Sequence, residues 1–224
     1  MAGLLTDEPV PHAAPSGWSA WLPAGAIIEA LQVPRTVDGK LFHEVLESRR
    51  SRVGSAVSWS DVEKLLWYGC RTIHNRGIGR AGIPIEWRRA PSAGGLHAVQ
   101  IICQMNYGDL SPRIYLPARH AFALIASATE AYKQNCKDVQ AVLGRTTGCT
   151  LRLIADIRKI DAAYQNGESL AWRDSGSLGA TLCLVAEWLG LKSTILGFAG
   201  NSYLKTIGFP DNRFLAVGAV QLTS

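Results

Sequence analysis

The stretch RRAPSAGGLHAVQIICQ, residues 88–104, is the most informative part of this sequence because it joins two arginines, a flexible turn and an apolar run. The turn at 91–95 consists of small residues and proline, so its backbone N–H groups can approach another molecule closely. The run at 99–103 is typical of a core strand. Cations beside such a turn favour an anionic partner. An ordinary tight turn before a strand is the structural alternative.

The segments around this stretch predict an α+β fold. Helices are expected at 39–50, 58–70, 119–133, 168–190 and 201–209. Strands are expected at 97–106, 112–117, 149–159, 193–198 and 213–222, and a loop at 71–90. Ser60 and Glu63 are expected to form the capping box of helix 58–70. Because helices and strands do not alternate regularly, a doubly wound parallel sheet is not expected.

The longest predicted helix, 168–190, has two distinct faces. One face carries large apolar side chains: Leu178, Leu182, Val185 and Leu189. Another carries small residues, at which a neighbouring backbone can come close: Gly176, Gly179 and Ala180. Gly190 supplies the C-terminal stop.

Composition indicates one globular domain at 39–224, preceded by an extended arm at 1–38. The chain has 224 residues, of which 47% are hydrophobic and 18% are charged, enough for a sizeable core. Trp18 and Trp21 of the arm are expected to lie against the body or a partner subunit. No signal peptide is recognised, and no apolar run reaches the roughly 18 residues of a membrane span.

Cysteines, histidines and charge argue against several classes of function. Five cysteines without CxxC or metal spacing are typical of reduced, cytoplasmic core thiols, and five histidines without ligand spacing predict no metal site. The net charge of +5 contains no long basic block, so nucleic-acid binding is not favoured. A phosphorylated ligand or an acidic peptide explains the surplus equally well. Neither a Walker loop nor a GxGxxG fingerprint is present.

Two further segments could bind an anion or a flat ligand. In SRRSR, 48–52, arginine forks and serine hydroxyls suit a phosphate, whereas the structural alternative is a solvated helix end. In TILGF, 194–198, a strand end can present backbone N–H groups to a planar ring, or it can be a strand end alone.

The order of these motifs resembles the nitroreductase-like flavoprotein superfamily, within it the SagB/McbC type of dehydrogenase. RRSR, PSAGGLH, RIYLPARHAFALI, RDSGSLGATLCLVAEWLGL and ILGF follow one another from about residue 44 to the C-terminus. PSAGGLH looks like the group's PSAGALYP motif. The resemblance implies a central, mostly antiparallel sheet flanked by helices, bound FMN, and a homodimer in which 168–190 is the dimer-core helix.

The resemblance also implies site residues. The phosphate and ribityl side of FMN would contact Arg49, Arg50 and Ser51. The turn would approach the flavin bound mainly by the other protomer, through Pro91, Ser92, Ala93 and Gly94. Leu196 and Gly197 would lie near the polar edge of the ring. Tyr164 and His97 are the catalytic base candidates, and simple packing is the alternative for each.

Departures from the family pattern leave the function open between three hypotheses. The lysine of the Lys-Tyr pair linked to azoline oxidation is replaced by Ala163. The leading hypothesis is an FMN-dependent dehydrogenase that oxidises a peptide-derived substrate, such as an azoline, with biosynthetic partner proteins. The second is a general NAD(P)H-dependent nitro or quinone reductase. The third is a non-catalytic subunit that organises a biosynthetic complex.

Overall fold

A seven-stranded antiparallel sheet forms the centre of the computed structural model, which describes residues 7–13, 16–35, 39–126 and 129–224. The strand order is β10-β11-β8-β5-β6-β7-β2, and every neighbouring pair is antiparallel. The strands are β2 (Ile27–Ala30), β5 (Val99–Met105), β6 (Arg113–Leu116), β7 (Ala121–Leu124), β8 (Cys149–Asp156), β10 (Lys192–Leu196) and β11 (Phe214–Thr223). The α+β prediction with a mostly antiparallel sheet is confirmed.

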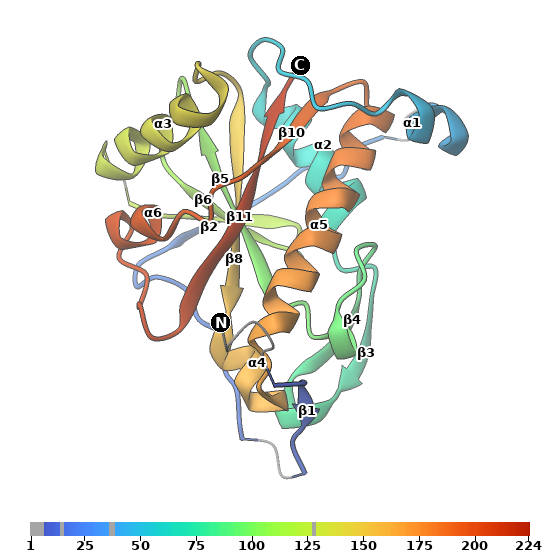
Figure 1. Ribbon diagram of the computed structural model, residues 1–224, viewed down its shortest axis with the longest axis vertical. Coiled ribbons are helices and arrows are strands. Elements are labelled where there is room, and N and C mark those ends of the chain that lie inside the picture. Colours follow the sequence, from blue (N-terminus) through green and yellow to red (C-terminus); the bar gives the residue numbers. More distant parts are fainter. Residues whose placement is uncertain (1–6, 14–15, 36–38, 127–128) are drawn as a thin grey trace, which may run out of the picture.

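Helices cover both sides of this sheet (Figure 1). They are α1 (Phe42–Ser48), α2 (Trp59–Cys70), α3 (Thr129–Leu143), α4 (Ile157–Ala163), α5 (Glu168–Trp188) and α6 (Asn201–Thr206). Helices α2 and α5 pack on one side, and α3 and α6 lie on the other. Because both faces are covered, the central strand β8 is buried along its whole length.

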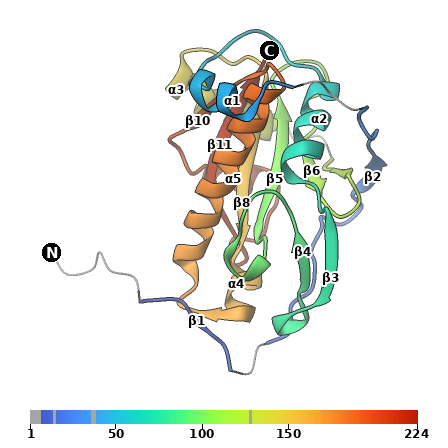
Figure 2. The same ribbon diagram turned by 90° about the vertical axis from the view of Figure 1, so that its right-hand side faces the viewer.

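Two small two-stranded sheets lie outside the main sheet. β3 (His74–Ile78) pairs with β4 (Pro84–Trp87), within the segment predicted as a loop, so that prediction was wrong. β1 (Val10–Pro11) of the N-terminal arm pairs with β9 (Tyr164–Gln165). Figure 2 shows β3 and β4 side by side at the right of the view, with the arm segment that carries β1 passing along the bottom.

Several expected boundaries were also wrong. Helix α2 is capped by Ser58 with Asp61 as its N3 partner, two residues earlier than the predicted pair of Ser60 and Glu63. The helix expected at 119–133 is instead strand β7 followed by α3. The strand expected at 149–159 ends at Asp156, because the Asp156 carboxylate accepts the N–H of Lys159 and begins α4.

The small residues of helix α5 differ in whether they are buried or exposed. A Cβ at Gly179 would lie 3.8 Å from Ile195 and 3.9 Å from Leu153, both on the sheet, so Gly179 packs against its own protomer. Gly176 and Ala180 are exposed, and a Cβ at Gly176 would meet no atom within 4 Å. The three predicted small residues therefore do not share one face: Gly179 is buried in the protomer, and Gly176 and Ala180 are exposed to another molecule.

The N-terminal arm follows the body closely. Trp18 donates its indole N–H to Asp156 at 3.0 Å, and Trp21 stacks edge-on against Phe209 at 4.8 Å between ring centroids. Residues Ile27–Ala30 then add β2 to the edge of the main sheet. The expectation that both tryptophans lie against the body is confirmed.

Candidate functional site

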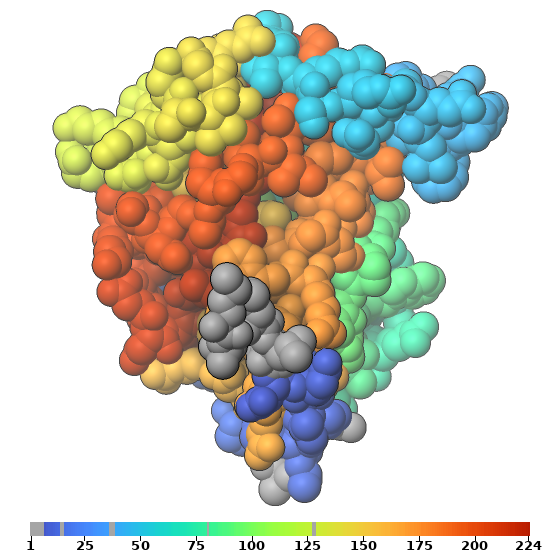
Figure 3. Space-filling model, viewed as in Figure 1, coloured from blue at the N-terminus to red at the C-terminus, as the bar shows by residue number. Residues whose placement is uncertain are grey.

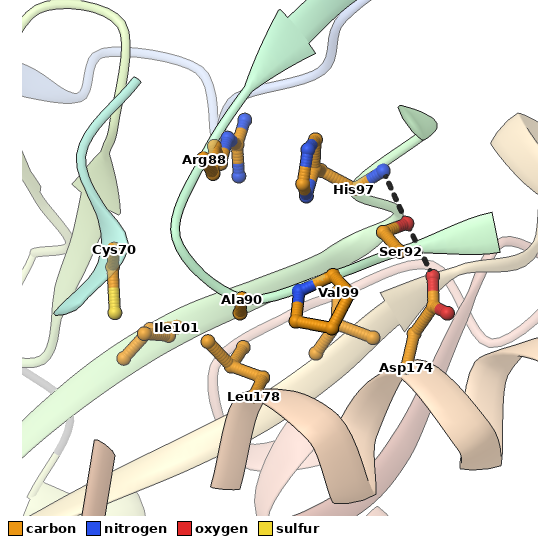
Figure 4. Close-up of a pocket in the computed structure, with 10 residues that line it drawn as sticks. Cys70, Arg88, Ala90, Ser92, His97, Val99, Ile101, Asp174 and Leu178 are labelled. Carbon is orange, nitrogen blue, oxygen red and sulfur yellow. Dashed lines mark hydrogen bonds between the residues drawn. The ribbon is translucent and has the colours of Figure 1, made fainter. Parts of the chain in front are cut away.

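The turn at 91–95 is held against helix α5 by hydrogen bonds from three of its residues. Ser92 Oγ donates to Asp174 Oδ2 at 2.5 Å, and the Ala93 N–H donates to Asp174 Oδ1 at 3.1 Å. Ser177 Oγ donates to the Pro91 carbonyl at 3.0 Å. Figure 4 shows Ser92 and Asp174 facing one another across this junction. The turn is thus fixed on a rigid helix, as a preorganised binding loop requires.

Gly94 supplies the backbone conformation that the turn needs. Its φ is +59°, in the left-handed region that favours glycine. A Cβ at this position would also lie 2.7 Å from the Tyr164 hydroxyl oxygen. Two predicted site elements, the turn and Tyr164, are therefore brought together, although they are about 70 residues apart in the sequence.

His97 lies behind the turn, in the wall of a small cavity of about 30 Å³ that also involves Ser92, Asp174 and Cys70 (Figure 4). Its N–H donates to Ser92 Oγ at 2.8 Å, and its ring Nε2 lies 3.0 Å from the Glu86 carbonyl oxygen, so Nε2 must carry a proton. Burial, followed by the charge of Arg88, lowers the pKa of His97 to about 4. The ring is neutral at pH 7 and braces the turn.

Asp174 is a residue of this site that sequence reasoning did not include. Burial raises the pKa of its carboxyl group, and the hydrogen bonds from Ser92 and Ala93 partly offset that rise. The signal in the sequence was an acidic residue within an otherwise small and apolar helix. Its partners could not be identified because they lie more than 80 positions away.

The arginine cluster that follows α1 lies beside strand β10. Ser51 forms a parallel bridge with Ser193, the Arg52 N–H donates to the Ser193 carbonyl at 3.2 Å, and Thr194 Oγ1 donates to the Arg52 carbonyl at 3.1 Å. The two predicted ligand-binding segments, 48–52 and 194–198, are therefore neighbours, because residues 51 and 52 contact Ser193 and Thr194, where the second segment begins.

No salt bridge among the described residues neutralises this cluster, whose cations are Arg49, Arg50 and Arg52. Their only side-chain hydrogen bonds in that part of the chain run to backbone carbonyls of neighbouring residues. The cluster therefore has the free donors and positive charge that a phosphate group requires.

The predicted contacts from the end of β10 differ in character. The Leu196 side chain is 3% exposed and packs against Val139 and Ala219, so only its backbone can face a ligand. Gly197 is exposed, and a Cβ there would meet no atom within 4 Å. A flat molecule can approach the Gly197 backbone without obstruction.

The two surfaces contact α5 at different levels along its axis. The turn contacts Asp174 and Ser177, whereas the arginine segment lies near Cys183 and Glu187: Ser48 Oγ donates to Glu187 Oε1 at 2.8 Å. Burial raises the pKa of the Cys183 thiol, and Ser193 and Arg49 partly offset that rise. Nine helical positions from 174 to 183 correspond to roughly 13 Å.

Figure 3 shows this arrangement on one face of the molecule. The surface of α5, in orange, runs between the blue-cyan segment that contains α1, at its upper end, and the green segment of β3, β4 and the turn, at its lower right. The exposed Gly176 and Ala180 lie between the two surfaces along the helix.

Comparison with solved structures gives this architecture a name. The chain matches a candidate nitroreductase from Ralstonia eutropha JMP134 over 96% of both chains, with 16% identity and a TM-score of 0.62. The chain has a nitroreductase-like fold. No protein-family model and no curated protein matches the sequence.

Two further structures share the nitroreductase-like fold. One is the E. coli microcin synthetase McbBCD complex with truncated pro-MccB17 bound, where the match covers 92% of this chain and 78% of that chain at 16% identity, with a TM-score of 0.63. The other is a candidate nitroreductase from Desulfovibrio desulfuricans in complex with FMN, covering 82% and 85% at 15% identity, with a TM-score of 0.51.

Three further properties of the described residues complete the description. They include no group of three or more His, Cys, Asp and Glu side chains arranged to hold a metal ion. No helix in that part of the chain has the length and apolarity needed to cross a membrane. All five cysteines are free thiols, four of them buried.

Proposed function

We propose that this chain is an FMN-dependent oxidoreductase whose flavin sites are shared between two copies. The observation that carries the proposal is the position of the two surfaces along α5. One surface, near residues 183–187, presents arginines that have no carboxylate partner among the described residues, and the other, near 174–177, presents the turn and Tyr164. Position 180 lies midway between them.

A two-fold axis near Ala180, with the two α5 helices antiparallel, would bring the two surfaces into one composite site. Residue 176 of one copy would then face residue 184 of the other, and the arginine segment of one would face the turn of the other. Ala180 is exposed and small, as close helix packing at such an axis requires.

The residues present fit FMN. Arg49 and Arg50 offer guanidinium groups with no carboxylate partner among the described residues, which suits a phosphate monoester. The Gly197 backbone is open, and Gly94 brings a bare backbone to the surface. The Desulfovibrio protein with this fold is described with FMN, which supports the same cofactor here. When bound, FMN supplies hydride acceptance.

The chain's own groups would then orient the cofactor and handle protons. Arg49, Arg50 and Ser51 bind and orient the phosphate and ribityl side. The turn, braced by Asp174, excludes water from one face of the site. The Tyr164 hydroxyl beside Gly94 is the proposed proton acceptor. Because tyrosine is protonated at neutral pH, this role needs a nearby cation or the flavin itself.

A peptide-derived substrate is the favoured substrate class. It is supported by the fold shared with McbBCD, a synthetase described with a bound precursor, truncated pro-MccB17. A general nitro or quinone reductase is the second candidate, supported by the nitroreductase from Ralstonia that has the same fold. Oxidation of NAD(P)H with a quinone acceptor distinguishes the second from the first.

The test of the cofactor is direct. Purified protein should show flavin absorbance, and the molecule released by heat should have the mass of FMN. Release of FAD would contradict the proposed phosphate site. A protein that neither contains nor binds added FMN would contradict the proposal and favour the hypothesis of a non-catalytic subunit.

A further inference from the structure

A separate pocket lies beneath the N-terminal arm, on the side of the sheet that carries α6. Its volume is about 270 Å³, near the lower end of the roughly 300–1,000 Å³ typical of small-molecule sites. Its apolar lining includes Trp18 and Trp21 of the arm and Ile114 and Leu116 of β6. Flat, apolar walls of this kind suit an aromatic ring.

Polar groups with unused hydrogen-bonding capacity converge on the same pocket. Arg88 donates through Nε and Nη2 to Glu86 Oε2, which leaves its Nη1 without a partner among the described residues. Gln100 and Arg119 also line the pocket, and neither side chain enters a hydrogen bond with any described residue. These groups can donate five or more hydrogen bonds in total.

The surrounding charge is positive. Glu86 is neutralised by Arg88, and the buried Asp156 by Arg213. Lys159 packs 4.7 Å from the Trp18 ring centroid and is 8% exposed, yet it forms no salt bridge or side-chain hydrogen bond in the described part of the chain. Buried charges are normally paired, so a nearly buried lysine against Trp18, together with Arg88 and Arg119 in the pocket lining, favours an anion.

We propose that this pocket binds a small aromatic carboxylate. The ring lies between the arm tryptophans and β6, and the carboxylate accepts hydrogen bonds from Arg88 and Gln100. The pocket shares Arg88 and His97 with the small cavity behind the turn, but no residue of 48–52 and no residue of α5 lines it, so it is a different site from the proposed phosphate site.

Binding of 2-naphthoate and its neutral counterpart 2-naphthamide to the purified protein tests the proposal. Titration calorimetry should show that naphthoate binds at least about tenfold more tightly than the amide. Arg88→Gln should weaken naphthoate binding about tenfold or more and change naphthamide binding little. Gln100→Met, which leaves the Glu86 pair intact, should weaken naphthoate binding even if Arg88→Gln proves unstable.

Arg49→Gln is the matched control, since it removes a cation outside the pocket. It should leave naphthoate affinity unchanged, whereas an equal loss would mean that the ligand binds at the arginine cluster. Equal binding of the acid and the amide, unchanged naphthoate affinity in Gln100→Met, or no binding of either ligand would each overturn the proposal. Thermal melting of every variant establishes that the fold is retained.

Discussion

Replacing Ala180 with arginine is the sharpest test of the shared site. Ala180 is exposed on α5, so the substitution leaves the core of the protomer unchanged. If the two-fold axis passes near this residue, two like charges would be about 6 Å apart. At an effective dielectric of about 20 their repulsion is about 3 kcal/mol, or roughly a hundredfold in the dimer dissociation constant.

The choice of arginine makes the readout specific. Added positive charge cannot by itself weaken phosphate binding, so flavin loss from Ala180→Arg would follow from loss of the dimer. Light scattering over a dilution series measures the mass of the particle, and flavin absorbance measures occupancy. We expect a protein near the 24.2 kDa of one chain, with little flavin and a cooperative melt at a lower temperature, because the partner subunit and the flavin each stabilise the folded chain.

Val142→Arg is the matched control, because Val142 is 49% exposed on α3, on the other side of the sheet. It should retain both the dimer and the flavin. A monomeric Ala180→Arg protein that holds FMN fully would refute the shared site, and a dimer of unchanged affinity would refute the position of the axis. Gly179→Leu should instead destabilise each protomer, since Gly179 faces Ile195 and Leu153.

Three further outcomes follow from the site. Arg49→Ala should weaken FMN binding about ten- to hundredfold, the worth of a charge-assisted bond to phosphate, as measured by fluorescence titration; unchanged retention would make Arg49 a solvated charge. Gly94→Val should lower flavin occupancy because its side chain collides with the Tyr164 hydroxyl, whereas Gly108→Val, at a similar φ of +70° but in open space, should not. Folding lowers the pKa of His97 from 6.5 to about 4, so between these pH values the unfolded chain binds a proton that the folded chain excludes. The free energy of unfolding should therefore fall by up to roughly 2 kcal/mol as the pH is lowered from about 6.5 to about 4. Urea melts should show this slope, and His97→Gln should reduce it.

Local patterns in the sequence were sufficient for much of the fold. Helix α5 and strand β5 were predicted because a long helical period and a continuous apolar run are each determined by adjacent residues. The turn that precedes β5, and its glycine, followed from the same kind of local signal. The motif order additionally indicated the nitroreductase-like fold.

Segments with ambiguous local signals were decided by tertiary pairing. Residues 119–126 are rich in alanine and were expected to be helical, but β7 is a strand because it is hydrogen-bonded between β6 and β2. The capping box of α2 was expected at Ser60 and Glu63, but it forms two positions earlier, at Ser58 and Asp61. Neither outcome follows from the residues of the segment alone.

The candidate site shows the same division. Local residue types predicted candidate anion-binding groups in the arginines of 48–52 and the turn at 91–94, and the family resemblance added FMN as the expected ligand and Tyr164 as a base candidate. Only the tertiary structure decided that Ser51 lies beside Ser193, that Asp174 holds the turn, and that Gly179 faces inward while Ala180 faces outward. These contacts join residues that are up to about 140 positions apart, and the sheet order and helix rotation that create them depend on burial of the whole core.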